Sequence, residues 1–106
     1  MISMRMVAIA LTLSSVAVTA FGADPYTVKP ASGFVPDAVT AVRVAEAILI
    51  PIYGQTRVEG ERPFAAKLTG NVWKVTGYLP SGVDGGVAEA WIDKRDARIV
   101  RVTHGK

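Results

Sequence analysis

The spacing of apolar residues changes once along this chain, across the charged segment 55–62. Before that segment, apolar residues recur at intervals of three and four, which is the pattern of one helical face: Ala38, Ala41, Val42, Ala45, Ile48, Leu49 and Ile52. After it, apolar and polar residues alternate, as in strands with one buried face. A single helix must then cover one face of the sheet. The pattern therefore predicts an α+β fold.

The predicted helix covers residues 38–50. Pro36 suits its first turn, and Asp37 places a negative charge near the positive end of the helix dipole. Pro51 opposes an ordinary continuation, and Gly54 can end the segment in a left-handed conformation. We expect the residues that follow, up to Arg62, to form a connector.

Four strands are predicted, over residues 64–69, 72–79, 87–93 and 98–104. Gly70 and Asn71 form a two-residue turn of the kind found in tight hairpins. Residues 94–97 form a second turn. Because the connections are short, we expect an antiparallel meander, curved over the one N-terminal helix.

The N-terminal segment has the composition of a secretory signal. Arg5 precedes an uncharged apolar run, and small residues follow it. We predict a signal peptide over residues 1–22, cleaved near Ala20 or Gly22, and a periplasmic or secreted product that is not an integral membrane protein. An extended lead-in over residues 23–35 then precedes a single domain over residues 36–106.

Composition excludes several classes of function. The chain has no cysteine, so disulfides, zinc thiolates and thiol nucleophiles are absent. Without Arg5, 11 basic residues face 9 acidic ones, a net charge of +2. Nucleic-acid binding usually needs a denser basic stripe than this. We expect no nucleic-acid partner and no cofactor, and the sequence leaves the oligomeric state open.

The glycine-rich stretch 79–93, LPSGVDGGVAEAWID, does not resemble a ligand loop. A phosphate loop is usually followed by a helix and carries a cation, whereas this stretch leads into a period-2 segment and its first charge is Asp84. A calcium loop needs several oxygen ligands at fixed offsets. We interpret the stretch as a flexible connection between strands.

The candidates for catalysis are also weak. His104 lies near the C-terminus, where we expect it to face solvent. Glu89 and Asp93 share one strand face with Trp91 between them, but a glycosidase pair needs a sugar-sized cleft. We expect an exposed polar face there and predict that the protein is not an enzyme.

The two tryptophans are predicted to differ in role. Trp73 alternates with Val75, which assigns it to the core, whereas Trp91 lies among acids and suits a protein interface. Partial burial of Trp91 under the lead-in is the alternative. The predicted partner-binding residues are Tyr78, Asp84, Glu89, Trp91 and Asp93.

Several stretches, in this order and spacing, resemble bacterial immunity proteins with a nuclear-transport-factor-2-like (NTF2-like) fold. They are GFVPDAVTAVRVAEAILIPIYG, RPFAAKL and NVWKVTGYLPSGVDGGVAEAWIDKRDARIVRVTHGK. The resemblance implies a reduced version of that fold, and an antidote that binds a cognate toxin and neutralises it by occlusion. It implies no catalytic residues.

A second, weaker resemblance rests on AWIDKRDARIVRV, which is similar to secreted PepSY-type domains. In that family a glycine often stands near the position of Ala97. The resemblance implies a cystatin-like fold and a protease inhibitor or regulatory binding module. Both resemblances predict a sheet over a helix.

Overall fold

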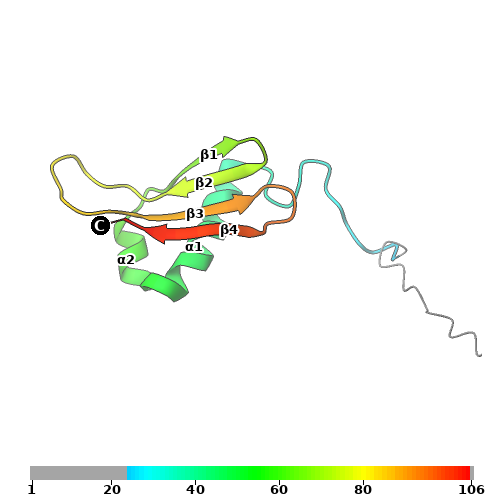
Figure 1. Ribbon diagram of the computed structural model, residues 1–106. Helices are drawn as coiled ribbons and strands as arrows, with labels where there is room; N and C mark the ends of the chain where they lie inside the picture. The colour runs from blue at the N-terminus through cyan, green and yellow to red at the C-terminus, as the bar shows by residue number, and fades with distance from the viewer. Residues whose placement is uncertain (1–23, 106) are drawn as a thin grey trace, which may run out of the picture.

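The computed structural model describes residues 24–105, which form a helical layer beneath a four-stranded sheet (Figure 1). The helices are α1 (Ala38–Tyr53) and α2 (Gln55–Gly60), and the strands are β1 (Ala65–Thr69), β2 (Val72–Thr76), β3 (Ala88–Asp93) and β4 (Ile99–His104). The strands pair antiparallel in the order β1-β2-β3-β4. The predicted α+β meander is confirmed. The predicted signal peptide lies outside the described residues.

Helix α1 begins at a side-chain cap and buries one stripe against the sheet. The carboxylate of Asp37 accepts the N–H of Thr40 at 2.8 Å, and this hydrogen bond lowers the pKa of Asp37. The residues buried along the stripe lie four apart: Ala41, Ala45 and Leu49. The stripe therefore has the period that the sequence predicts.

The prediction that the helix ends before Pro51 is wrong. Pro51 lies inside α1, and the carbonyl of Ala47 loses its usual N–H donor there. Both residues are exposed, so water can reach that carbonyl. The helix ends instead at Gly54, whose N–H donates to the carbonyl of Ile50 at 2.8 Å and whose φ is 95°. Gly54 therefore ends the helix, as predicted.

The predicted connector after Gly54 is mostly helical. Helix α2 buries one side chain, Val58, in the core. Six residues with a single apolar position show no periodic stripe, so the hydrophobic pattern could not identify this helix.

Strand β2 is shorter than predicted, and the connection to β3 is correspondingly longer. Pairing ends at Thr76, and residues 77–87 form a loop at one end of the sheet (Figure 1). The Gly70–Asn71 turn is present, with Gly70 at φ 59°. Ala97 closes the second turn at φ 65°, a left-handed conformation in which glycine is favoured.

The core lies between α1 and the inner face of the sheet. That face contributes the side chains of Trp73, Val75, Ala88, Ala90 and Ile92. The indole N–H of Trp73 donates to the carbonyl of Val35 at 2.8 Å, and Val35 is fully buried. The N–H of Val35 donates to the carbonyl of Lys94 at 3.0 Å. The end of the predicted lead-in is therefore part of the packed structure.

Candidate partner-binding surface

The sheet face opposite α1, here called the outer face, carries charged and aromatic side chains that point away from the helix. Because side chains alternate along each strand, the neighbours of the buried core residues point away from the helix. Across three strands, Lys74 lies opposite Trp91, and Trp91 lies opposite Arg101. One strand further out, Lys67 lies opposite Lys74.

Trp91 forms the centre of the outer face. The guanidinium of Arg101 lies 5.3 Å from its ring centroid, and the ammonium of Lys74 lies 5.9 Å from it. Cation–π contacts of this kind contribute about 0.5–1 kcal/mol each at exposed sites. The indole N–H donates to Glu89, whose carboxylate also lies 3.9 Å from Lys74. These contacts hold the half-buried ring in one orientation.

A β-bulge in β4 places an extra side chain beside Trp91. The register advances by one residue on β3, from Trp91 to Ile92, but by two on β4, from Arg101 to Ile99. Val100 and Arg101 are therefore both exposed, whereas the regular alternation expected for 98–104 pairs Val100 with Val102. Val100 lines a hollow of ≈ 490 Å³ with Thr69, Val72, Lys74 and Trp91.

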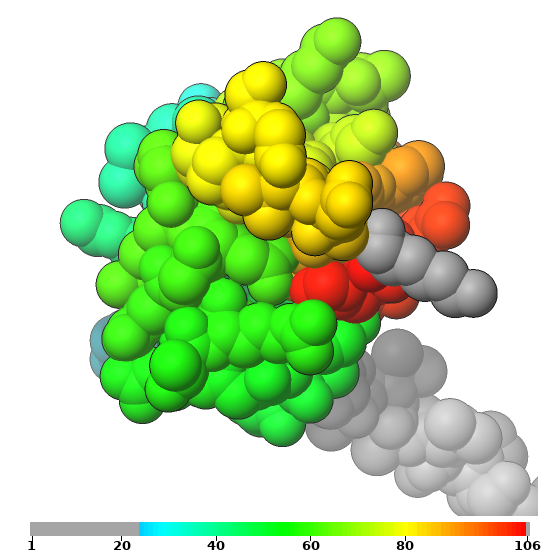
Figure 2. Space-filling model, turned by 90° about the vertical axis from the view of Figure 1, so that its left-hand side faces the viewer, coloured from blue at the N-terminus to red at the C-terminus, as the bar shows by residue number. Residues whose placement is uncertain are grey.

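Tyr78 and Asp84 lie apart from this centre, on the β2–β3 loop. The loop, yellow in Figure 2, stands above α2 and the end of β4. Tyr78 is 52% exposed, and two further apolar side chains of the loop, Leu79 and Val83, are also exposed. The five predicted residues therefore do not form one cluster. Glu89 and Trp91 are neighbours, and Tyr78 and Asp84 belong to a second surface.

The expectation that Asp93 is exposed is wrong. Asp93 is 1% exposed and accepts the backbone N–H of Arg95 at 2.9 Å. The Arg95 guanidinium donates to both carboxylate oxygens, at 3.1 and 2.8 Å, and the Arg98 guanidinium lies 3.9 Å away. The hydrogen bonds from Arg95 lower the pKa of Asp93 to about 2. Asp93 therefore fixes the β3–β4 turn.

His104 also differs from expectation, because it is packed and does not face solvent. Its Nε2 lies 3.2 Å from the Glu61 carboxylate, and its ring lies 5.1 Å from that of Tyr53. The same carboxylate accepts the N–H of Ala88 at 2.6 Å. Glu61 thus joins the end of α2 to the start of β3 and the end of β4.

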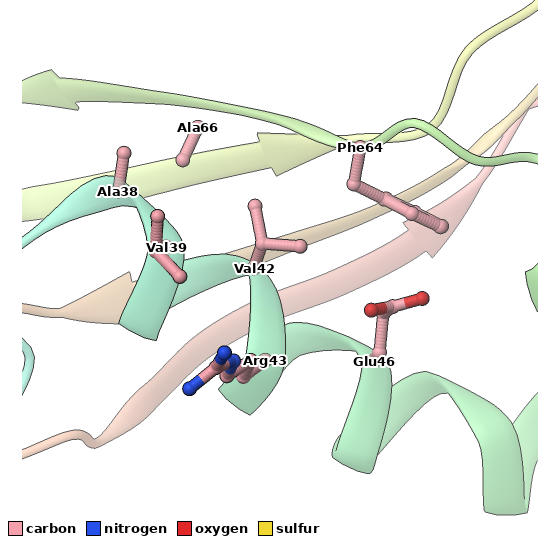
Figure 3. A pocket seen from close by; sticks show the side chains of 7 residues that line it. All are labelled: Ala38, Val39, Val42, Arg43, Glu46, Phe64 and Ala66. Carbon is pink, nitrogen blue, oxygen red and sulfur yellow. The ribbon is translucent and has the colours of Figure 1, made fainter.

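A second hollow, of ≈ 400 Å³, lies between α1 and β1. Val42 points from the helix toward the strand, with Phe64 at one end of the hollow and Arg43 and Glu46 at its helical edge (Figure 3). Glu46 accepts a hydrogen bond from Arg62 at 2.5 Å. The hollow is open and largely apolar, and its charged residues include no group with a candidate chemical role.

Two further properties concern residues 24–105 alone. No group of three or more His, Asp or Glu side chains in this range is arranged to hold a metal ion. No helix formed by these residues has the length and apolar character needed to span a membrane.

Sequence reasoning missed Lys74, Val100 and Arg101 as members of the surface. Regular pairing outward from the 94–97 turn would place Val100 opposite Trp91, and the bulge places Arg101 there instead. Lys74 could not be placed beside Trp91 either, because that pairing depends on where β2 and β3 end at their long connecting loop.

Comparison with known proteins identifies the family. Residues 40–106 match the family described as NTF2 fold immunity protein. This range includes all four described strands, α2, and α1 except for its first two residues. Searches of curated protein sequences and of solved structures returned no match. The family match agrees with the first of the two resemblances. The chain belongs to the family of NTF2 fold immunity proteins.

Proposed function

We propose that this protein is an exported antidote that binds a bacterial toxin and neutralises it by covering the surface that the toxin needs for its activity. The observation that carries the proposal is the family match over residues 40–106, since immunity proteins protect cells against toxins. The secretory character of residues 1–22 supports export, which would put the antidote where an incoming toxin crosses the envelope.

The geometry of the outer face favours binding over catalysis. Tryptophan and arginine are frequent anchors of protein interfaces, and Trp91 lies beside Arg101 on the outer face. The predicted site residues divide between two candidate contacts. Glu89 and Trp91 belong to the outer face, while Tyr78 and Asp84 would extend the contact from the β2–β3 loop. We leave Asp93 out of both because it is buried.

A competition experiment tests the proposed function. A strain that lacks this gene and any candidate toxin gene beside it is grown together with the parent strain. We expect the mutant to be killed or inhibited by its parent, and this gene alone to restore its growth. The parent must be shown to express every neighbouring candidate toxin. If the mutant then competes as well as the complemented strain, the proposal is contradicted.

Export is tested in the same strains. A version without residues 1–22 stays in the cytoplasm, and we expect it to protect poorly although it accumulates to the same level. Equal protection by both versions would show that the toxin is met inside the cell, and would contradict export as part of the function.

A further inference from the structure

We propose that the outer face around Trp91 binds an acidic segment of the toxin, with one apolar side chain of that segment in the hollow beside the indole. This inference rests on the proposed function, and it adds the partner's chemistry and the surface that meets it. Three observations support it: the shape of the face, its charge and the restraint on its central ring.

The hollow supplies the apolar part of the contact. It has a volume of ≈ 490 Å³, and Val72, Val100 and Trp91 form much of its lining. The β-bulge brings Val100 to this side. Val100 is 44% exposed, so a partner that covers it removes apolar surface from water.

The charge of the face selects an acidic partner. Lys67, Lys74 and Arg101 come from three different strands: Lys74 and Arg101 lie opposite Trp91 on its two sides, and Lys67 lies opposite Lys74 on the next strand. Of the described acidic groups, Glu89 is the one that lies among them, and its carboxylate already accepts from the Trp91 indole. Among the described residues, Lys67 and Arg101 form no ion pair, so carboxylates of a partner can meet them.

Two other occupants fit less well. A second copy of the chain on this face would bring the same three cations together across a two-fold axis, which is repulsive. A nucleic acid would offer phosphates to the cations but would also face the carboxylate of Glu89, and binding of that kind usually needs a longer basic stripe. A protein segment supplies both carboxylates and an apolar side chain.

The two tryptophans allow a direct test by nuclear magnetic resonance. The purified protein is titrated with a short peptide in which Glu alternates with Leu, while the indole N–H signals are followed. We expect the Trp91 signal to shift and the signal of the buried Trp73 to stay in place. The comparison ligands are a peptide in which Lys alternates with Leu and a single-stranded oligonucleotide with the same charge as the acidic peptide.

Three outcomes would overturn the inference. They are no shift of the Trp91 signal with the acidic peptide, an equal or larger shift with the basic peptide or the oligonucleotide, and a shift on dilution alone, which indicates self-association. Each outcome points to a different occupant or to none.

Charge reversal provides the matched variants. Lys74→Glu with Arg101→Glu should weaken binding of the acidic peptide by about ten-fold or more, because like charges would then meet at the centre of the contact. The control is Lys29→Glu, which reverses a charge in the exposed lead-in away from the outer face and should leave binding unchanged. A thermal melt of each variant checks that the fold is intact.

A protection assay in cells distinguishes failure of this inference from failure of the proposed function. If the wild-type protein protects cells and the Lys74→Glu, Arg101→Glu variant protects equally well, the surface is wrong and the function stands. If the wild-type protein protects against no toxin, the function is wrong, and the peptide titration still decides what the surface binds.

Discussion

At the scale of single residues, alternation along the strands separates two tryptophans that look alike in the sequence. Trp73 is 8% exposed and donates to the buried Val35, whereas Trp91 stays half-buried on the outer face. Both assignments follow from neighbouring residues, because Trp73 alternates with Val75 and Trp91 with Glu89. The hydrogen bond to Val35 could not be predicted, since it depends on where the lead-in packs.

Replacement of each tryptophan by alanine should therefore have unequal effects. We expect Trp73→Ala to lower the free energy of unfolding by about 3–5 kcal/mol, as large core truncations do. Trp91→Ala should cost about 1 kcal/mol, because the ring packs on one side and loses its cation–π contacts. Urea unfolding of the two variants measures both values. The reverse order would contradict the assignment of the two sheet faces.

Asp93 shows where residue-level prediction fails. Strand alternation places it with Glu89 and Trp91 on an exposed face, but Arg95 and Arg98 in the following turn make an acid stable in a buried position. Arg95 and Arg98 follow Asp93 by two and five residues, so both partners are close to it in the sequence. That they reach its carboxylate can be inferred only once the geometry of the turn is known.

The low pKa of Asp93 makes stability depend on pH. The folded-state pKa is lowered from 3.8 to about 2, so the carboxylate stabilises the fold above the unfolded pKa. That contribution is lost as pH falls from about 4 through 2. We expect Asp93→Asn to lower the melting temperature at pH 6 and to flatten its decline between pH 4 and 2. Asp84→Asn, in the exposed loop, is the control, and equal profiles for both variants would contradict this role.

At the scale of elements, the helix and the four strands could be predicted, but their ends and the short helix could not. Pro51 is tolerated because it faces solvent, and α2 has too few residues to show a periodic face. The β2–β3 loop was expected to be shorter. Its end is fixed by Glu61, which accepts the N–H of Ala88, and by a close approach of Gly86 to Gly105.

The close approach of Gly86 to Gly105 leaves no room for a side chain at the end of the sheet where β3 begins and β4 ends. A Cβ atom at Gly86 would lie 2.0 Å from the carbonyl carbon of Gly105, so the two backbones must separate to accept a side chain. Gly86→Ala should cost about 1–3 kcal/mol, as overpacking does. Gly60→Ala is the control because a Cβ there meets nothing within 4 Å. Similar melting temperatures for both variants would contradict the contact.

At the scale of the whole molecule, the class of fold follows from one change in apolar period, while the proposed function rests on the family. Helices cover one face of the sheet and leave the other open (Figure 1). Trp91 and Glu89 on the open face could be predicted from the sequence. The surrounding Lys74, Val100 and Arg101 required the register and the bulge.

The stoichiometry of inhibition tests the central claim most directly. A candidate toxin encoded beside this gene is mixed with increasing amounts of the purified protein, and the remaining toxin activity is measured. Occlusion predicts a linear loss of activity that is complete near one equivalent and does not progress with time. Inactivation that proceeds to completion well below one equivalent would indicate catalysis, and full activity in excess antidote would indicate no binding. Either result would contradict neutralisation by occlusion.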